Sequence, residues 1–326
     1  MNEQLIVMSP RATNRFFQVL GEVKGGHFSV VGLWRDGTVV GSFTESTSGE
    51  TFVATYSHDS GIRKLASRAS YATSVMPDGR VCGHLGFGDE AFLFSPVDGF
   101  QYLTTPPQAE RASAHACGQA GLIGGTAEAR AGDQAVLWSS GKPMMLEGGP
   151  ASILAMSREG DLAGQLADGS AFRIKASQVG QPAPSFASLN GAYRRPVAIQ
   201  SGMGILLASR YASGSQEIGW WSPSGDYQVL PQLGERAQPI GADLEGNVLA
   251  FGTDATGQLR HYLIQTDGTV VILSGELIES DGVTVATMTA ISEDGTIAGL
   301  GLKDGQEFVV TLRMANQSRA VVEMPT

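Results

Sequence analysis

The sequence is poor in cysteine and in charge, and lysine and arginine are scarcer than the acids. Its two cysteines, Cys82 and Cys117, fall inside predicted strands, where they are expected as buried small apolar residues and not as a disulfide framework. Charged residues make up 17%, and 22 lysines and arginines against 32 acids give a net charge of −10. Because nucleic-acid binding depends on neutralising phosphates, this balance argues against that class of partner.

Targeting signals and catalytic motifs are also missing. No apolar run is long enough to span a membrane, so no membrane partner is expected. The first residues have no basic segment, and Pro10 and Arg11 interrupt the first apolar run. We therefore expect a cytoplasmic location, with a secreted mature chain as the alternative. The sequence has no G-x-S-x-G, H-E-x-x-H or phosphate-loop pattern, and its acids fall mostly in turns, so no cofactor or metal site is predicted.

The chain does contain a repeat of about 40 residues. Each copy has a glycine, a branched aliphatic residue two places on, and a glycine or alanine four places on. Six copies follow the first at intervals of 42, 42, 39, 44, 42 and 49 residues. The first glycines are Gly37, Gly79, Gly121, Gly160, Gly204, Gly246 and Gly295.

Each repeat is typical of a four-stranded antiparallel blade. A strand with a small residue leads into an Asp-Gly or Glu-Gly turn, as at Asp36-Gly37 and Asp78-Gly79, which is a strong hairpin signal. An aliphatic strand, an aromatic-rich strand and an outer strand follow. No stretch shows a helical period with caps. The sequence therefore predicts one all-β domain over residues 1–326, a monomeric seven-bladed β-propeller.

The two ends of the sequence predict how the ring closes. Residues 5–10 resemble the third strands of other repeats, and residues 16–20 resemble outer strands. Residues 286–291 and 296–300 form an inner half, so the two termini are expected to pair within one blade. Residues 308–312 give an eighth candidate third strand, with 320–323 as a further strand. An eighth, incomplete blade is the alternative.

One family resemblance accompanies this pattern. The aromatic strands "AFLFS" at 91–95 and "AVLWS" at 135–139, with the small-residue strand and the acidic-residue–glycine turn, resemble the short HAF-type propeller repeats of bacterial proteins. The repeats lack the Trp-Asp ending of WD40 blades and the double glycine of kelch blades. The resemblance implies the fold alone, because that class has no shared catalytic motif.

Cationic residues recur before the inner strands of most repeats. Ten places before four of the first glycines stand His27, Arg111, Arg194 and Arg236; Arg68 lies one place further back in its repeat, and Arg195 follows Arg194. Rotational repetition predicts a partial ring of positive charge at one mouth of the propeller, where guanidinium groups can bind carboxylates or phosphates. In the alternative interpretation these residues pair with acids such as Glu110 and Glu235 and only hold the blades together.

Two functions fit this ring. The first is a non-catalytic platform that binds a partner protein, an anionic small molecule or a saccharide over the arginine-lined mouth. The second is a lyase or hydrolase acting on a uronate-containing saccharide, with arginine neutralising the carboxylate and His84, His115 or Tyr193 moving the proton. Since no catalytic motif is present, we favour the first, and a structural role for each histidine is the simpler interpretation.

Overall fold

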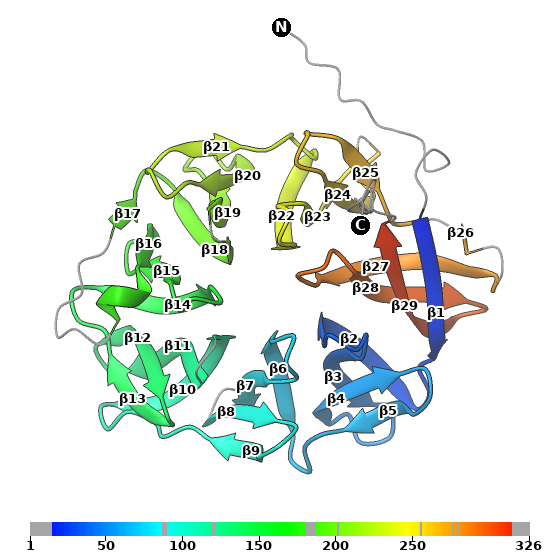
Figure 1. Cartoon of the computed structure of the whole chain (residues 1–326), viewed down its shortest axis with the longest axis horizontal. Coiled ribbons are helices and arrows are strands. Elements are labelled where there is room, and N and C mark those ends of the chain that lie inside the picture. The colour runs from blue at the N-terminus through cyan, green and yellow to red at the C-terminus, as the bar shows by residue number, and fades with distance from the viewer. Residues whose placement is uncertain are drawn as a thin grey trace, which may run out of the picture.

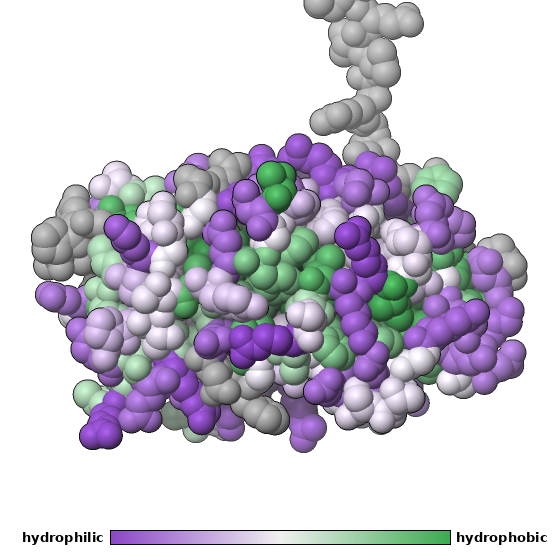
Figure 2. Space-filling view, turned by 90° about the horizontal axis from the view of Figure 1, so that it is seen from below, coloured by the Kyte–Doolittle hydropathy of each residue, from purple (hydrophilic) through white to green (hydrophobic). Residues whose placement is uncertain are grey.

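The fold is seen in a computed structural model, which describes residues 15–86, 90–118, 121–179, 187–200, 202–254, 256–275, 277–278 and 281–314. Over these residues seven antiparallel sheets stand around a central axis, and their innermost strands surround it (Figure 1). The prediction of a seven-bladed all-β propeller is confirmed. Seen edge-on, the disc carries hydrophilic side chains with hydrophobic ones between them (Figure 2).

Six blades are built from consecutive strands. Blade 1 is β2 (Gly26–Leu33), β3 (Val39–Glu45), β4 (Thr51–Ser57) and β5 (Gly61–Lys64); blade 2 is β6 (Ser70–Val75), β7 (Val81–Leu85), β8 (Glu90–Ser95) and β9 (Gly99–Tyr102); blade 3 is β10 (Ala109–Cys117), β11 (Leu122–Ala129), β12 (Gly132–Ser139) and β13 (Lys142–Met145). Blade 4 is β14 (Pro150–Met156), β15 (Leu162–Leu166), β16 (Ala171–Ile174) and β17 (Ala187–Leu189); blade 5 is β18 (Tyr193–Gln200), β19 (Gly204–Arg210), β20 (Gln216–Trp221) and β21 (Tyr227–Val229); blade 6 is β22 (Glu235–Ala242), β23 (Val248–Thr253), β24 (Leu259–Ile264) and β25 (Val270–Ile272).

Blade 7 closes the ring with strands from both ends of the chain. It contains β27 (Val283–Ile291), β28 (Ile297–Lys303) and β29 (Gln306–Met314), and β1 (Arg15–Glu22) pairs with β29 as the outer strand. A short strand, β26 (Leu277–Ile278), pairs with the start of β27. The predicted outer strand at 16–20 is confirmed. The third strand of this blade is β29, which contains residues 308–312, whereas residues 5–10 and 320–323 lie outside the described part of the chain.

The hairpin turns explain why glycine recurs. The Gly37 N–H donates to the Trp34 carbonyl at 3.0 Å, and the Gly79 N–H donates to the Met76 carbonyl at 3.0 Å. These turns place glycine at φ 87° and 99°, a region that residues with a Cβ rarely adopt. In blade 5 the register differs from the sequence expectation. Ile199 pairs with Ile205 as Leu33 pairs with Val39, so Met203 and not Gly204 occupies the turn position.

Every inner strand carries a β-bulge at the same level. The skipped residues are Val31, Thr73, His115, Leu154, Val197, Ile240 and Thr289. The small residue after the bulge faces the next blade: a Cβ on Gly32 would lie 2.6 Å from the Cβ of Val75. Two bulge threonines bond across to the next inner strand, Thr73 to the Ala114 carbonyl at 2.7 Å and Thr289 to the Val30 carbonyl at 3.0 Å. At these two junctions the bulge residue therefore bonds one blade to the next.

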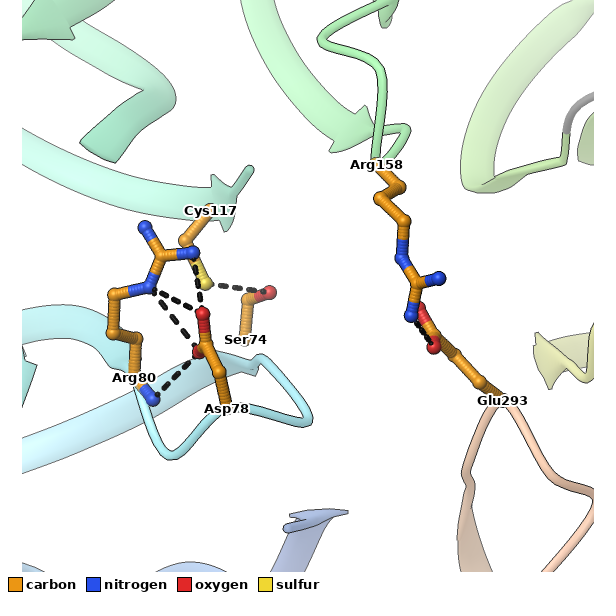
Figure 3. Close-up of polar contacts among 6 residues, drawn as sticks. All are labelled: Ser74, Asp78, Arg80, Cys117, Arg158 and Glu293. Atoms are coloured by element: carbon orange, nitrogen blue, oxygen red, sulfur yellow. Dashed lines mark hydrogen bonds and ion pairs between the residues drawn. The ribbon is translucent and has the colours of Figure 1, made fainter. Parts of the chain in front are cut away.

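The core lies between blades. Large aromatic side chains of the third strands are fully buried there, among them Phe92, Trp138 and Trp221. Cys82 and Cys117 are free and buried, as expected, and the Cys117 Sγ lies 3.5 Å from the Ser74 Oγ of the neighbouring blade (Figure 3).

Blade 4 has a long connection between its third strand, β16, and its outer strand, β17. Its outer strand β17 is present but has three residues, and one 3-10 turn, η3 (Ala176–Gln178), precedes it. Most of the Pro- and Gly-rich stretch at 178–185 lies outside the described residues. Within the described ranges no helix is long and apolar enough to cross a membrane.

Candidate functional site

A cavity of about 790 Å³ opens between blades 5 and 6, where β18 begins and β19 ends. The predicted cations lie near the starts of inner strands. Because β18 and β19 are antiparallel, the start of β18 lies beside the end of β19, so the cavity opens on the same side of the ring as these cations. Its polar lining consists of Tyr193, Arg195, Ser209, Arg210, Tyr211, Gln216 and Gln238. A cavity of this size, with a few polar groups converging on it, is typical of a ligand-binding site.

Two exposed arginines give this cavity its charge. Arg195 lies on β18 and Arg210 lies at the end of β19, and neither forms an ion pair with any acid in the described ranges. Tyr193 is 55% exposed at the rim, and its hydroxyl donates to Gln165 Oε1 at 3.3 Å. The cavity therefore presents two unbalanced guanidinium groups beside phenol and amide groups.

A buried arginine, Arg194, contacts two residues that line the cavity, Ser209 and Tyr211. Arg194 is 5% exposed, and its Nη1 donates to the Ser209 Oγ at 2.9 Å. Its guanidinium carbon lies 4.5 Å from the ring centroid of Tyr227 and 5.8 Å from that of Tyr211, so the cation is stacked against two phenols. The Tyr211 hydroxyl donates to Glu217. Burial and the hydrogen bond to Glu217 raise the pKa of Tyr211, which keeps it a neutral donor.

The buried position of Arg194 corrects its place in the predicted ring. Because the blade 5 hairpin is shifted by one residue, Tyr193 occupies the position equivalent to His27, and Arg194 occupies the position of the buried Phe28. Arg195 then aligns with Ser29, on the exposed face of the inner strand. The cation at this mouth in blade 5 is therefore Arg195.

Two of the other four predicted ring members are engaged by acids. His27 Nδ1 lies 2.7 Å from Glu307 Oε1 of blade 7, and Arg68 Nη1 lies 3.2 Å from Glu90 Oε2 of its own blade. Arg111 lies at an exposed position on β10. Arg236 is exposed, and its backbone φ is 60°. It lies near the start of β22, where the pairing with β23 is irregular. The structure thus brings Arg195 to the cavity together with Tyr193, and it leaves His27 and Arg68 in interactions that join strands.

The two candidate histidines lie on neighbouring blades, His84 on β7 of blade 2 and His115 on β10 of blade 3. His84 of β7 stacks on Tyr71 with ring centroids 5.3 Å apart, and its Nδ1 is buried without a hydrogen-bond partner among the described residues. His115 is the bulge residue of β10, and its Nε2 lies 3.0 Å from the Thr126 Oγ1. Burial, followed by the charges of His84 and Arg195, lowers the pKa of His115 to about 4.

The opposite mouth, on the side of the hairpin turns, is crossed by an ion pair. Arg158 of the β14–β15 turn reaches Glu293 of the β27–β28 turn, and the two residues come from opposite parts of the ring (Figure 3). They line a cavity of about 300 Å³ with Trp34 and Leu244. Neighbouring turns are also joined, since the Arg35 N–H donates to the Pro77 carbonyl at 3.0 Å. This mouth is therefore narrowed by side chains that bridge it.

Several residues of the larger cavity were missed by the sequence reasoning. Arg210, Tyr211, Gln216 and Gln238 come from the end of one strand, its turn, and the starts of β20 and β22. The available signal for Arg210 was its charge at the end of β19, where it is exposed. Within the described ranges, no group of three or more His, Cys, Asp or Glu side chains is arranged to hold a metal ion.

Replacing Arg194 with Ala should destabilise the protein, whereas Arg236→Ala should be nearly neutral. The Arg194 change removes a buried hydrogen bond and two cation–π contacts, which we expect to cost about 2 kcal/mol. Arg236 is exposed, and such changes usually stay within about 0.5 kcal/mol. Urea unfolding of both variants checks this. Equal midpoints would contradict the structural role assigned to Arg194.

Comparison with known proteins gives the fold. No family model matches the chain, and no curated protein does, so the HAF-type resemblance stays a prediction. A catalytically inactive virginiamycin B lyase from Staphylococcus aureus, solved with quinupristin, is 13% identical with a TM-score of 0.59, covering 92% of this chain and 100% of that one. The WD40 β-propeller domain of Doa1 is 13% identical with a TM-score of 0.56, covering 93% and 98%. U3-55K is 14% identical with a TM-score of 0.51, covering 91% and 98%. At these identities the likeness establishes that the chain has the β-propeller fold.

Proposed function

We propose that this propeller is a non-catalytic binding platform whose cavity between blades 5 and 6 holds an anionic group of a ligand or partner protein. The observation that carries the proposal is the pair Arg195 and Arg210, which line one cavity without an acid partner among the described residues. The chain as a whole has a net charge of −10, so two unbalanced cations in one concavity are a local exception.

The chemistry of the cavity supports an anion over a neutral ligand. Each guanidinium offers N–H donors in a planar fork that matches a carboxylate or a phosphate. Tyr193, Gln216 and Gln238 add polar groups at the rim. The floor is rigid because Arg194 fixes Ser209 and packs on Tyr211, so little ordering is required when a ligand binds.

The lyase alternative receives less support. A general base works best when its pKa lies near the working pH, and the pKa of His115 is lowered to about 4. At neutral pH this imidazole is a weak base. Tyr193 donates to Gln165 at the rim of the cavity. One propeller with this fold is a lyase and another is a WD40 domain, so the fold supports either class.

A binding titration with charge variants tests the platform. The probes are a glutamate-rich peptide and an oligogalacturonate, measured against the wild type, the double variant Arg195→Gln/Arg210→Gln, and Arg63→Gln as a matched control. Arg63 is an exposed arginine on β5, the outer strand of blade 1, whereas the cavity lies between blades 5 and 6. Loss of two charge-assisted interactions should weaken binding by at least about tenfold. The wild-type affinity should also fall as salt rises.

Several results would contradict this proposal. Equal affinities for the double variant and the Arg63 control would place the site elsewhere, and no binding of either probe would refute an anion site in this cavity. A shortened oligogalacturonate with an ultraviolet-absorbing unsaturated end would establish a lyase. Co-purification of a stoichiometric protein from the source cell, lost in the double variant only, would identify the anion as part of a protein partner.

A further inference from the structure

The cavity between blades 5 and 6 lies where a hydrogen bond seen at another junction cannot form. Between blades 1 and 2, the Ala72 N–H of the inner strand donates to the Ser42 Oγ at 3.1 Å. The equivalent residues between blades 5 and 6 are Ala208, whose side chain has no polar atom, and Pro239, which has no N–H. The sequence itself therefore removes both partners of this bond.

At two further junctions a longer side chain occupies the position of Ala208. Gln165 of blade 4 donates its Nε2 to the Arg194 carbonyl of blade 5 at 2.8 Å. Leu300 of blade 7 is buried in the core. Both residues are equivalent to Ala208 in the register of their blades. Alanine at this position leaves space between blades 5 and 6 that a longer side chain fills elsewhere.

The strand register shows which side chains border this space. Directly opposed residues of antiparallel strands lie on the same face of the sheet. Arg195 opposes Ala208, and Arg210, two residues further along β19, opposes Gln216. Leu206, on the same face of β19, packs in the core with residues of blade 6. Towards this end of the strand the face therefore carries two guanidinium groups and an amide in place of apolar side chains, and all three line the cavity.

Arg195 and Arg210 are placed to hold one anion together. They are diagonal neighbours on adjacent strands, at a spacing of roughly 7–8 Å that long side chains can span. Both are exposed, and the methyl group of Ala208 beside them leaves room for a ligand. Each guanidinium is a planar fork of donors, so the pair can bind one carboxylate from two sides.

The rest of the lining favours a ligand covered with hydroxyl groups. Of the described residues that line the cavity, none is Leu, Ile, Val, Met, Phe or Trp. Apart from the arginines they are glycine, alanine, and residues with hydroxyl or amide groups, namely Tyr193, Ser209, Tyr211, Gln216 and Gln238. The large apolar anchor by which protein partners often bind would find no apolar pocket here. Tyr193 is more than half exposed, so its ring offers a flat surface at the rim.

We propose that the ligand is an acidic saccharide, with the carboxylate of one uronate unit held between Arg195 and Arg210 and its hydroxyl groups bound by the neighbouring amides and hydroxyls of the lining. This inference rests on the proposed function, because both arginines belong to that site. It adds the class of ligand, a sugar that supplies both the charge and the hydroxyl groups. The saccharide is bound and none of its bonds is broken.

Calorimetric titrations at one fixed salt concentration test the ligand class. The acidic probes are oligogalacturonate, oligoalginate and hyaluronan oligosaccharides, each beside its neutral methyl ester, and a glutamate-rich peptide of equal charge is the comparison. We expect at least one acidic saccharide to bind about tenfold or more tightly than its methyl ester and than the peptide, because its carboxylate and its hydroxyl groups both contribute. Arg195→Gln/Arg210→Gln should remove the preference for the acid over its ester, whereas Arg63→Gln should keep it.

A cavity-filling variant, Ala208→Leu, tests whether the saccharide lies in this cavity. Leucine keeps both positive charges but occupies the space beside them, so saccharide binding should be lost. Leu300 shows that leucine is accepted at the equivalent position of blade 7. Ala187→Leu is the matched control, because Ala187 is exposed on the outer strand β17 of blade 4. Thermal melts of both variants verify that they are folded.

The outcomes separate this inference from the proposed function. Peptide binding as tight as that of every acidic saccharide, and lost in Arg195→Gln/Arg210→Gln, would leave the platform standing and overturn the saccharide. A methyl ester that binds as tightly as its acid would overturn the role of the carboxylate. Unchanged saccharide affinity in folded Ala208→Leu would place the saccharide outside this cavity and overturn the inference. No binding of any probe would overturn both proposals.

Discussion

Replacing Gly83 or Gly125 with Val should destabilise the propeller severely, by about 3 kcal/mol. A Cβ on Gly83 would lie well under 3.0 Å from the Tyr71 carbonyl oxygen and 2.9 Å from the Cζ of Phe92. A Cβ on Gly125 would lie well under 3.0 Å from the Ser113 carbonyl oxygen and 3.0 Å from the Cζ3 of Trp138. The oxygen belongs to the inner strand, and that strand is packed against the next blade, so the backbone has little room to move.

The measurement is the urea or thermal midpoint of both variants beside Gln101→Val. Gln101 is exposed on the outer strand β9, so valine there adds a β-branched residue without a collision. A Gly83→Val midpoint equal to that of the control would show that the inner strands can separate. In blade 5 the position equivalent to Gly83 is occupied by Leu207, whose partner on the inner strand is Pro196. A residue with a side chain at this position is therefore accommodated in that blade.

Removing residues 1–22 should open the ring. These residues include β1, which covers the edge of β29 through seven paired positions from Arg15 to Glu22. Without it, β29 becomes an unpaired edge, the core residue Leu20 is removed, and Val23 loses the strand that precedes it. We expect a melting midpoint lower by on the order of 10 °C and concentration-dependent aggregation.

A shorter truncation provides the control. Removing residues 1–14 leaves β1 intact, so its midpoint should match that of the full chain. Light scattering and thermal melts of the two truncations distinguish the role of β1 from a general effect of shortening. If the 1–22 truncation remains monomeric and equally stable, blade 7 is complete with β27, β28 and β29 alone.

The fold was predictable because one physical pattern recurs seven times. A turn that requires positive φ selects glycine, and crowding near the axis selects small residues, so both leave regular marks in the sequence. Blade 5 was aligned one residue off because Met203 occupies the turn position and glycines flank it at 202 and 204. That single shift made Arg194 look equivalent to His27, when it lies on the buried face beside Tyr227.

The candidate site was predictable only in part. The excess of cations near the starts of inner strands pointed to the mouth at which this cavity lies, and Arg195 and Tyr193 line the cavity. Arg210 follows no repeat offset and lies at the end of a second strand. Its meeting with Arg195 depends on antiparallel pairing within blade 5, where Arg195 opposes Ala208. Contacts between blades, such as the bond from Thr73 to the Ala114 carbonyl, are likewise not encoded in a single repeat.

The pairing of β1 with β29 also determines when blade 7 can be completed during protein synthesis. β1 ends at Glu22 and its partner begins at Gln306, so 283 residues separate the two strands. At ~5–20 residues per second, β1 emerges from the ribosome roughly 15–60 s before its partner exists. Blades 1 to 6 can form in order during that time, while β1 waits as a single strand with both edges open. Among the described strands, β1 is therefore the one most exposed to wrong pairing, or to capture by a chaperone, during synthesis.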